Sequence, residues 1–165
     1  MRFYNVWYIK FVVSFLSTLT CFTSDSTGVF IYHEVLQVDF DELYENAKRV
    51  LNPRRLSESV EVGGVGSALL TDKGNVYLGV CIDTASSMGF CAEHAAAAAM
   101  VTAGENVIKK MVAVSWDGAV LPPCGRCREF ITQLADENFE TEVLVREDVV
   151  ARLGDLLPYN WRDAL

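Results

Sequence analysis

Two short runs of the 165-residue sequence hold the residues best suited to chemistry. The run GFCAEH contains Cys91 and Glu93, and the run PPCGRC contains Cys124 and Cys127. Both runs fall where a loop is expected to enter a helix. The free backbone N–H groups and the positive dipole at a helix N-terminus favour thiolate over thiol. The sequence therefore predicts three thiolates that converge on one metal ion.

The number of these cysteines bears on the kind of metal site. Three ligands leave the fourth tetrahedral position of Zn²⁺ open, which is typical of a catalytic rather than a structural zinc site. The alternative is a closed structural site, in which Cys81 or His94 supplies the fourth ligand. We favour the open site, because a closed site would leave Glu93 without a role.

Glu93 lies two residues after Cys91, inside the first expected helical turn. From there its carboxylate can reach a water on the zinc ion without binding the metal, as a general acid/base must. The alternative is an ordinary first-turn acid that stabilises the helix dipole. Its place beside three cysteines favours the acid/base role.

Three thiolates on a divalent cation leave the site with one negative charge, which would make a bound water a weaker acid. Hydrogen bonds from the two helix N-termini can withdraw part of that charge, and Arg126 or Arg128 can add a cation behind the ligands. Arg126 could equally be a solvated surface residue. We expect these groups to support the metal ligands without touching the metal.

Hydrophobic periodicity predicts the elements that must hold these residues. Helices are expected over residues 39–51, 92–103, 125–135 and 149–157, and strands over 65–71, 75–82, 111–116 and 142–146. The turn Asp72-Lys73-Gly74 predicts a hairpin between the first two strands. This order is typical of an α/β domain in which helices cover a mixed sheet.

Composition narrows the classes of function. Apolar residues make up 51% of the chain, which is enough for one core, and the net charge is −8 with no long run of Lys or Arg. This charge distribution argues against nucleic acid as a binding partner. The odd number of cysteines, five, indicates reduced thiols and hence a cytoplasmic protein rather than a disulfide framework.

Residues 1–38 do not fit the rest of the chain. The apolar run from Val6 to Cys21 is interrupted by Lys10 and precedes no A-x-A cleavage site, so it is a poor signal peptide and too short to span a membrane. Val38 is a residue that a GTG start codon would encode. We hypothesise that residues 1–37 are translated upstream sequence and that residues 39–165 form the domain. Export would instead require a genuine signal segment in residues 1–24.

The pair C-A-E and P-C-x-x-C resembles the zinc-dependent cytidine deaminase superfamily, whose signature it matches. The nearest branch contains free-nucleoside cytidine deaminases and blasticidin-S deaminases, and the run VGSALLTDKGNVYLGV and the closing LLP extend the resemblance. It implies a three-layer α/β/α sandwich with a five-stranded sheet, assembled as a homotetramer. It also implies that Cys91, Cys124 and Cys127 bind Zn²⁺ and that Glu93 is catalytic.

The resemblance implies hydrolytic deamination of cytidine and deoxycytidine in pyrimidine salvage, with a nucleoside contacted by Ala92 and Asp83. The sugar-binding N-x-E of the family is replaced here by Cys81-Ile82-Asp83. Asp83 can still accept a hydrogen bond from a hydroxyl, but Cys81 cannot replace an amide. A modified cytosine nucleoside such as blasticidin S is therefore the alternative substrate. A zinc-stabilised binding module without turnover is a further alternative.

Overall fold

The computed structural model describes residues 38–164. The predicted leader and Cys21 lie outside these residues. No helix within 38–164 has both the length and the apolar character needed to cross a bilayer. The first helix, α1 (Phe40–Arg49), begins after Asp39, whose carboxylate accepts a hydrogen bond of 2.9 Å from the backbone N–H of Glu42. The predicted first helix is therefore confirmed, together with its capping residue.

Six strands and two further helices follow α1. Their bounds are β1 (Arg54–Ser57), β2 (Val60–Thr71), β3 (Val76–Thr84), α2 (Ala92–Thr102), β4 (Ile108–Ser115), α3 (Gly125–Leu134), β5 (Glu142–Arg146) and β6 (Val149–Arg152). The long strand β2 pairs antiparallel with β1, β3 and β4. Strand β4 is parallel to β5, which pairs antiparallel with β6. The sheet is therefore mixed, as the sequence predicts.

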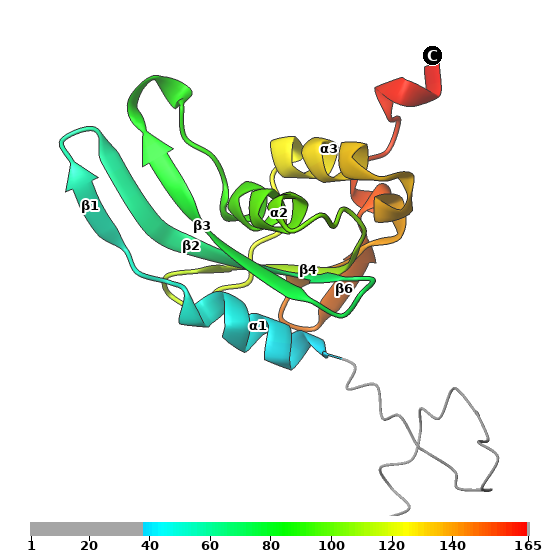
Figure 1. Ribbon diagram of the computed structural model, residues 1–165, viewed down its shortest axis with the longest axis horizontal. Coiled ribbons are helices and arrows are strands. Elements are labelled where there is room, and N and C mark those ends of the chain that lie inside the picture. The colour runs from blue at the N-terminus through cyan, green and yellow to red at the C-terminus, as the bar shows by residue number, and fades with distance from the viewer. Residues whose placement is uncertain (1–37, 165) are drawn as a thin grey trace, which may run out of the picture. The chain divides into compact units, whose positions relative to one another are not determined.

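Helices cover both faces of this sheet (Figure 1). On one face, α1 buries Leu43 and Ala47 against Ala68 and Val112 of the central strands. On the other face, α2 and α3 bury a second cluster that includes Met100, Ile131 and Leu69. Strands β2 and β4 contribute to both clusters, because successive side chains of a strand point to opposite faces. The three-layer α/β/α architecture is thereby confirmed.

Two predicted details are wrong. Residues 149–157 were expected to form a helix, but Val149–Arg152 form β6 and a single 3₁₀ turn covers Gly154–Leu156. The β-branched Val149 and Val150 suit a strand, and β6 turns back on β5 through Glu147-Asp148. The sheet also has six strands instead of five, because the short β1 pairs with the start of β2.

Candidate active site

The three site cysteines lie where loops enter α2 and α3, as predicted. Cys91 is the N-cap residue of α2, and Cys124 is the N-cap residue of α3. Neither thiol forms a side-chain capping hydrogen bond to its own helix. Cys127 lies in the first turn of α3 and is fully buried. The two helix N-termini therefore present three sulfurs toward each other.

Backbone pairing holds both loops against the sheet. Ile82 and Phe90 exchange two hydrogen bonds, of 3.0 and 2.9 Å, which close the loop between β3 and Cys91. Only glycine fits at position 89, since a Cβ there would overlap the carbonyl oxygen of Ile82. The loop before α3 is fixed similarly, by a hydrogen bond of 2.9 Å from Leu121 N–H to the carbonyl of Ala113. Each cysteine loop is thus fixed directly to a strand.

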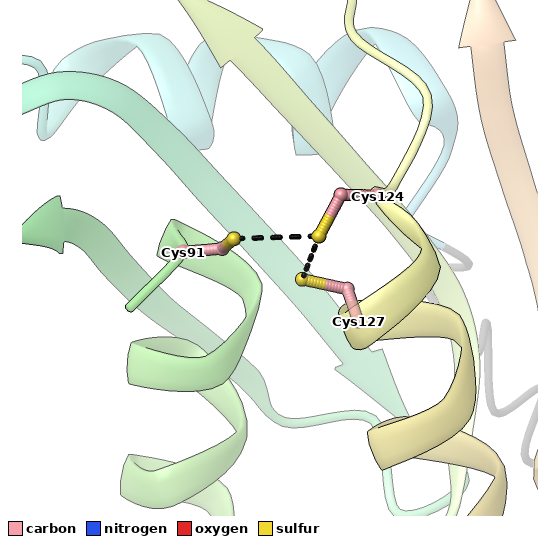
Figure 2. Close-up of side chains that lie close together, drawn as sticks. All are labelled: Cys91, Cys124 and Cys127. Atoms are coloured by element: carbon pink, nitrogen blue, oxygen red, sulfur yellow. Dashed lines mark hydrogen bonds between the residues drawn. The ribbon is translucent and has the colours of Figure 1, made fainter. Parts of the chain in front are cut away.

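The three sulfur atoms form a compact cluster (Figure 2). The Sγ atoms of Cys91 and Cys124 are 3.5 Å apart, those of Cys124 and Cys127 are also 3.5 Å apart, and all three lie within 4.8 Å of one another. A tetrahedral zinc ion with Zn–S bonds of about 2.3 Å places its sulfur ligands about 3.8 Å apart. The cluster therefore has the dimensions of a zinc site.

Without a nearby cation, two of the three thiols are hard to ionise. Burial raises the pKa of Cys91 to about 11, and burial, followed by the charge of Glu93, raises that of Cys127 further. Burial also opposes ionisation of Cys124, but the nearby backbone N–H of Cys127, the thiols of Cys91 and Cys127 and the nearby backbone N–H of Arg126 together outweigh it and lower the pKa of this thiol. Three adjacent thiolates need a positive partner, and Zn²⁺ binds thiolates without changing its own oxidation state.

Two other candidate ligands lie outside this cluster. Within residues 38–164, neither Cys81 nor His94 belongs to the group of ligand atoms that can share one metal ion. The Nδ1 atom of His94 lies 3.3 Å from Cys127 Sγ, and its ring stacks on Phe130 with centroids 4.3 Å apart. Within the described part of the chain, three candidate ligands are therefore brought together, and neither Cys81 nor His94 joins them.

Glu93 lies in the first turn of α2, with only 4% of its surface exposed. Burial raises the pKa of this carboxyl group. A raised pKa makes a carboxylate a stronger base, which suits a group that takes up and passes on a proton. Because Glu93 also lines the cavity next to the cysteines, it can meet a ligand there.

A cavity of about 310 Å³ opens beside the cluster. Both predicted substrate-contacting residues, Asp83 and Ala92, line it. Its apolar wall was not predicted and comes from distant parts of the chain, namely Val65, Phe90, Ala113, Leu121 and Pro122. Val65 and Ala113 carry no sequence signal of a binding site, since only the sheet brings them there, whereas Phe90 and Pro122 belong to the two cysteine runs.

The two predicted supporting arginines contact backbone carbonyl groups. Arg126 also lines the cavity and donates a hydrogen bond of 3.1 Å to the carbonyl of Gly89, which connects α3 to the loop before Cys91. Arg128 donates to the carbonyls of Pro123, at 2.8 Å, and Leu156, at 3.0 Å. Both guanidinium groups therefore hold the loops that carry the metal ligands.

Known proteins share this arrangement. The family model for the cytidine and deoxycytidylate deaminase zinc-binding region matches residues 42–141. A cytidine deaminase of Mycobacterium tuberculosis is 38% identical over 96 residues, which are 57% of this chain and 69% of that protein.

Solved structures agree with this match. The crystal structure of cytidine deaminase from Mycobacterium tuberculosis superposes with a TM-score of 0.64 at 30% identity, covering 76% of this chain and 98% of that one. The enzyme from Burkholderia pseudomallei gives a TM-score of 0.61 at 27% identity, with 74% and 98% covered. With a zinc-sized cluster of three cysteines at its centre, the chain belongs to the zinc-binding cytidine and deoxycytidylate deaminase family.

Proposed function

We propose that the protein hydrolyses cytidine and deoxycytidine to uridine and deoxyuridine, with release of ammonia. The observation that carries this proposal is the buried carboxylate of Glu93 beside the cluster of Cys91, Cys124 and Cys127, at one wall of a cavity of about 310 Å³. A cavity of this volume accepts a small molecule such as a nucleoside. Family membership supports the same reaction.

In this proposal the three cysteines hold Zn²⁺, which supplies an activated water at neutral pH. Glu93 accepts a proton from the attacking water and delivers it to N3 of the cytosine ring, while the oxygen of that water forms a bond to C4. A second proton transfer through Glu93 lets the 4-amino group leave as ammonia. The carbonyl oxygen at C4 of the product therefore comes from water, and the nitrogen of the 4-amino group leaves in ammonia.

The other residues that line the cavity indicate where the base and the sugar of the substrate bind. The apolar side chains of Val65, Phe90 and Leu121 suit the flat faces of a pyrimidine ring, and the small Ala92 leaves room next to the metal ligand. Asp83, at the end of β3, is exposed and supplies an acceptor for a sugar hydroxyl. The pocket as a whole therefore suits a cytosine nucleoside.

The test is an ultraviolet absorbance assay of the zinc-loaded protein with cytidine, deoxycytidine, cytosine, blasticidin S and adenosine. Turnover of cytidine and deoxycytidine is the expected result. Turnover of blasticidin S alone would replace the proposed substrate by a modified nucleoside. A zinc-loaded protein that releases no ammonia from any cytosine compound would instead be a binding module.

We further propose that this activity serves pyrimidine salvage in the cytoplasm and that the protein is a homotetramer. Reduced thiols at the metal site suit a reducing compartment. Large apolar side chains such as Leu56, Trp116 and Val150 are exposed on the described part of the chain and offer area for subunit contacts. Light scattering of the zinc-loaded protein tests the assembly, and a monomeric mass would contradict it.

A further inference from the structure

Cys81 and Asp83 share one face of β3. Tyr77 and Gly79 of the same strand face α2: Tyr77 packs on the cluster that α2 helps to bury, and Gly79 contacts the α2 backbone. Side chains two residues apart along a strand point the same way, so Cys81 and Asp83 project to the α2 side as well. Both residues line the cavity beside Glu93.

A break in strand pairing gives Cys81 an unusual partner. The register between β2 and β3 shifts between Val62 and Gly66, which is typical of a β-bulge. The backbone N–H of Val65, within the bulge, donates to Cys81 Sγ at 3.3 Å. The β2 backbone thus fixes the position of the sulfur at the cavity wall.

Cys81 in turn donates its single hydrogen to Asp83 Oδ2, at 3.4 Å. Burial raises the pKa of the Cys81 thiol, so the hydrogen needed for this bond is retained at neutral pH. A thiol is a weak donor and a weak acceptor, and here its one hydrogen is donated to Asp83 while its sulfur accepts from the Val65 backbone. Cys81 therefore has no free hydrogen to donate to a ligand and is only a weak acceptor, whereas the other carboxylate oxygen of Asp83 can accept a hydrogen bond from a ligand.

We propose that Cys81 is a positioning residue for Asp83, and that the pair makes the cavity recognise a single sugar hydroxyl of a cytosine nucleoside. This inference rests on the proposed function. Asp83 is exposed at the end of a strand, and the thiol holds its carboxylate toward the cavity. A second hydroxyl placed beside the sulfur finds no strong partner, so its presence or absence changes binding little.

The steady-state kinetics of the variants Asp83→Ala, Cys81→Ala and Cys81→Ser test this inference. Asp83→Ala should lower kcat/KM for cytidine by about 10- to 100-fold, the scale of a lost hydrogen bond to a charged group. Cys81→Ala should raise KM for cytidine by about 3- to 10-fold with little change in kcat, since only binding of the sugar is affected. Cys81→Ser should restore KM, because a hydroxyl can also accept from Val65 and donate to Asp83.

A double-mutant cycle shows whether Cys81 acts through Asp83. Adding Cys81→Ala to Asp83→Ala should lower kcat/KM no further, whereas independent effects would multiply. Free cytosine has no sugar, so neither substitution should change its turnover. 2′-Deoxycytidine and 3′-deoxycytidine each lack one sugar hydroxyl. Cys81→Ala should no longer raise KM for whichever of these two substrates lacks the recognised hydroxyl.

Val80→Ala is the matched control, because Val80 neighbours Cys81 on β3 but does not line the cavity. Zinc content and the thermal midpoint identify a variant that fails to fold, and in that case Cys81→Val, which also lacks a donor, replaces Cys81→Ala in the cycle. The inference would be overturned, and the proposed function would stand, if the two substitutions lowered kcat/KM independently. An effect of Cys81→Ala that persists with both deoxynucleosides would have the same consequence. A wild-type enzyme inactive on both cytidine and deoxycytidine would overturn the proposed function, and the inference with it.

Discussion

The proposed chemistry depends most on the carboxyl group of Glu93. Glu93→Gln keeps the shape of this buried side chain but cannot carry a proton. We expect the variant to retain zinc and its thermal midpoint while kcat falls by at least about 10²- to 10⁴-fold, the usual contribution of a general acid/base. The absorbance assay and metal analysis of the same sample measure both quantities. Activity within tenfold of the wild type would exclude Glu93 as the proton carrier.

The zinc content of single variants distinguishes the three proposed metal ligands from Cys81, the other thiol of the cavity. Changing Cys91, Cys124 or Cys127 to Ala should each release zinc, because two thiolates hold a zinc ion much less tightly than three. Cys81→Ala should retain zinc, since the sulfur of Cys81 forms hydrogen bonds with Val65 and Asp83 and lies outside the three-cysteine cluster. Equal zinc loss in Cys81→Ala and Cys124→Ala would indicate a closed structural site.

The sequence predicts part of this site and not the rest, for a physical reason. The positions of Cys91, Cys124 and Cys127 follow from spacing near two helix N-termini, which is a local property. The contact of His94 with Cys127 could have been suspected from its place one helical turn after Cys91. In contrast, Val65 and Ala113 reach the cavity only through the pairing of β2 with β4, which no local pattern reveals.

At the scale of elements, the closeness of β3 and α2 positions the site. Gly79 of β3 lies so near α2 that a Cβ atom would overlap the backbone of Ala92 and Ala96. Gly79→Ala should therefore push α2 away and lower the free energy of unfolding by about 1–3 kcal/mol, as overpacking does. Because Cys91 and Glu93 lie at the start of α2, kcat should fall as well.

Chemical unfolding with urea and the absorbance assay measure these two effects. Gly64→Ala is the control, since a Cβ at Gly64 meets no atom within 4 Å and its backbone is not left-handed. If Gly79→Ala were as stable and active as Gly64→Ala, the close approach of β3 to α2 would not matter for the site.

A second contact between elements predicts a dependence of stability on pH. Glu105, which follows α2, accepts hydrogen bonds of 2.6 Å from Asn75 and 2.9 Å from Tyr77 on the β2–β3 hairpin. Hydrogen bonding, first from Thr71 and then from Tyr77 and Asn75, lowers the pKa of Glu105 in the folded protein. The carboxylate therefore stabilises the fold above its unfolded pKa of about 4.3, and this contribution is lost as pH falls through the folded pKa.

Urea unfolding of the wild type and of Glu105→Gln from about pH 3 to pH 7 measures this contribution. The wild type should be the more stable protein at pH 7, and the difference should shrink as the solution becomes acidic. A difference that stays constant over this range would show that Glu105 does not act through its charge.

Elements with strong periodicity were predictable, whereas those that depend on a partner strand were not. Helix α1 has a capping residue and an amphipathic pattern, and α2 consists of strong helix formers. Strand β1 is exposed at all four positions, so it shows no alternation and forms only because β2 offers its edge. The sequence predicts a helix where β6 lies, because pairing with β5, and not a local pattern, determines the conformation of this segment.

At the scale of the whole molecule, residues 38–164 contain both buried clusters, the three cysteines and the cavity. We propose that this part forms the deaminase domain and that residues 1–37 are dispensable for its activity. A chain that starts at Val38 should bind one zinc ion per subunit and show the kcat/KM of the full chain within about twofold, the error of such a comparison. A chain that folds without activity would mean that the preceding residues contribute to the site.

Arg128 connects the metal site to the end of the chain. One guanidinium group binds the carbonyl of Pro123, directly before a cysteine ligand, and the carbonyl of Leu156, close to the C-terminus. Fraying of the last segment would release one side of this link, and the loop that carries Cys124 would lose its outer support. Metal loss during storage or after C-terminal tagging would then report on a loosened tail, even with every ligand intact.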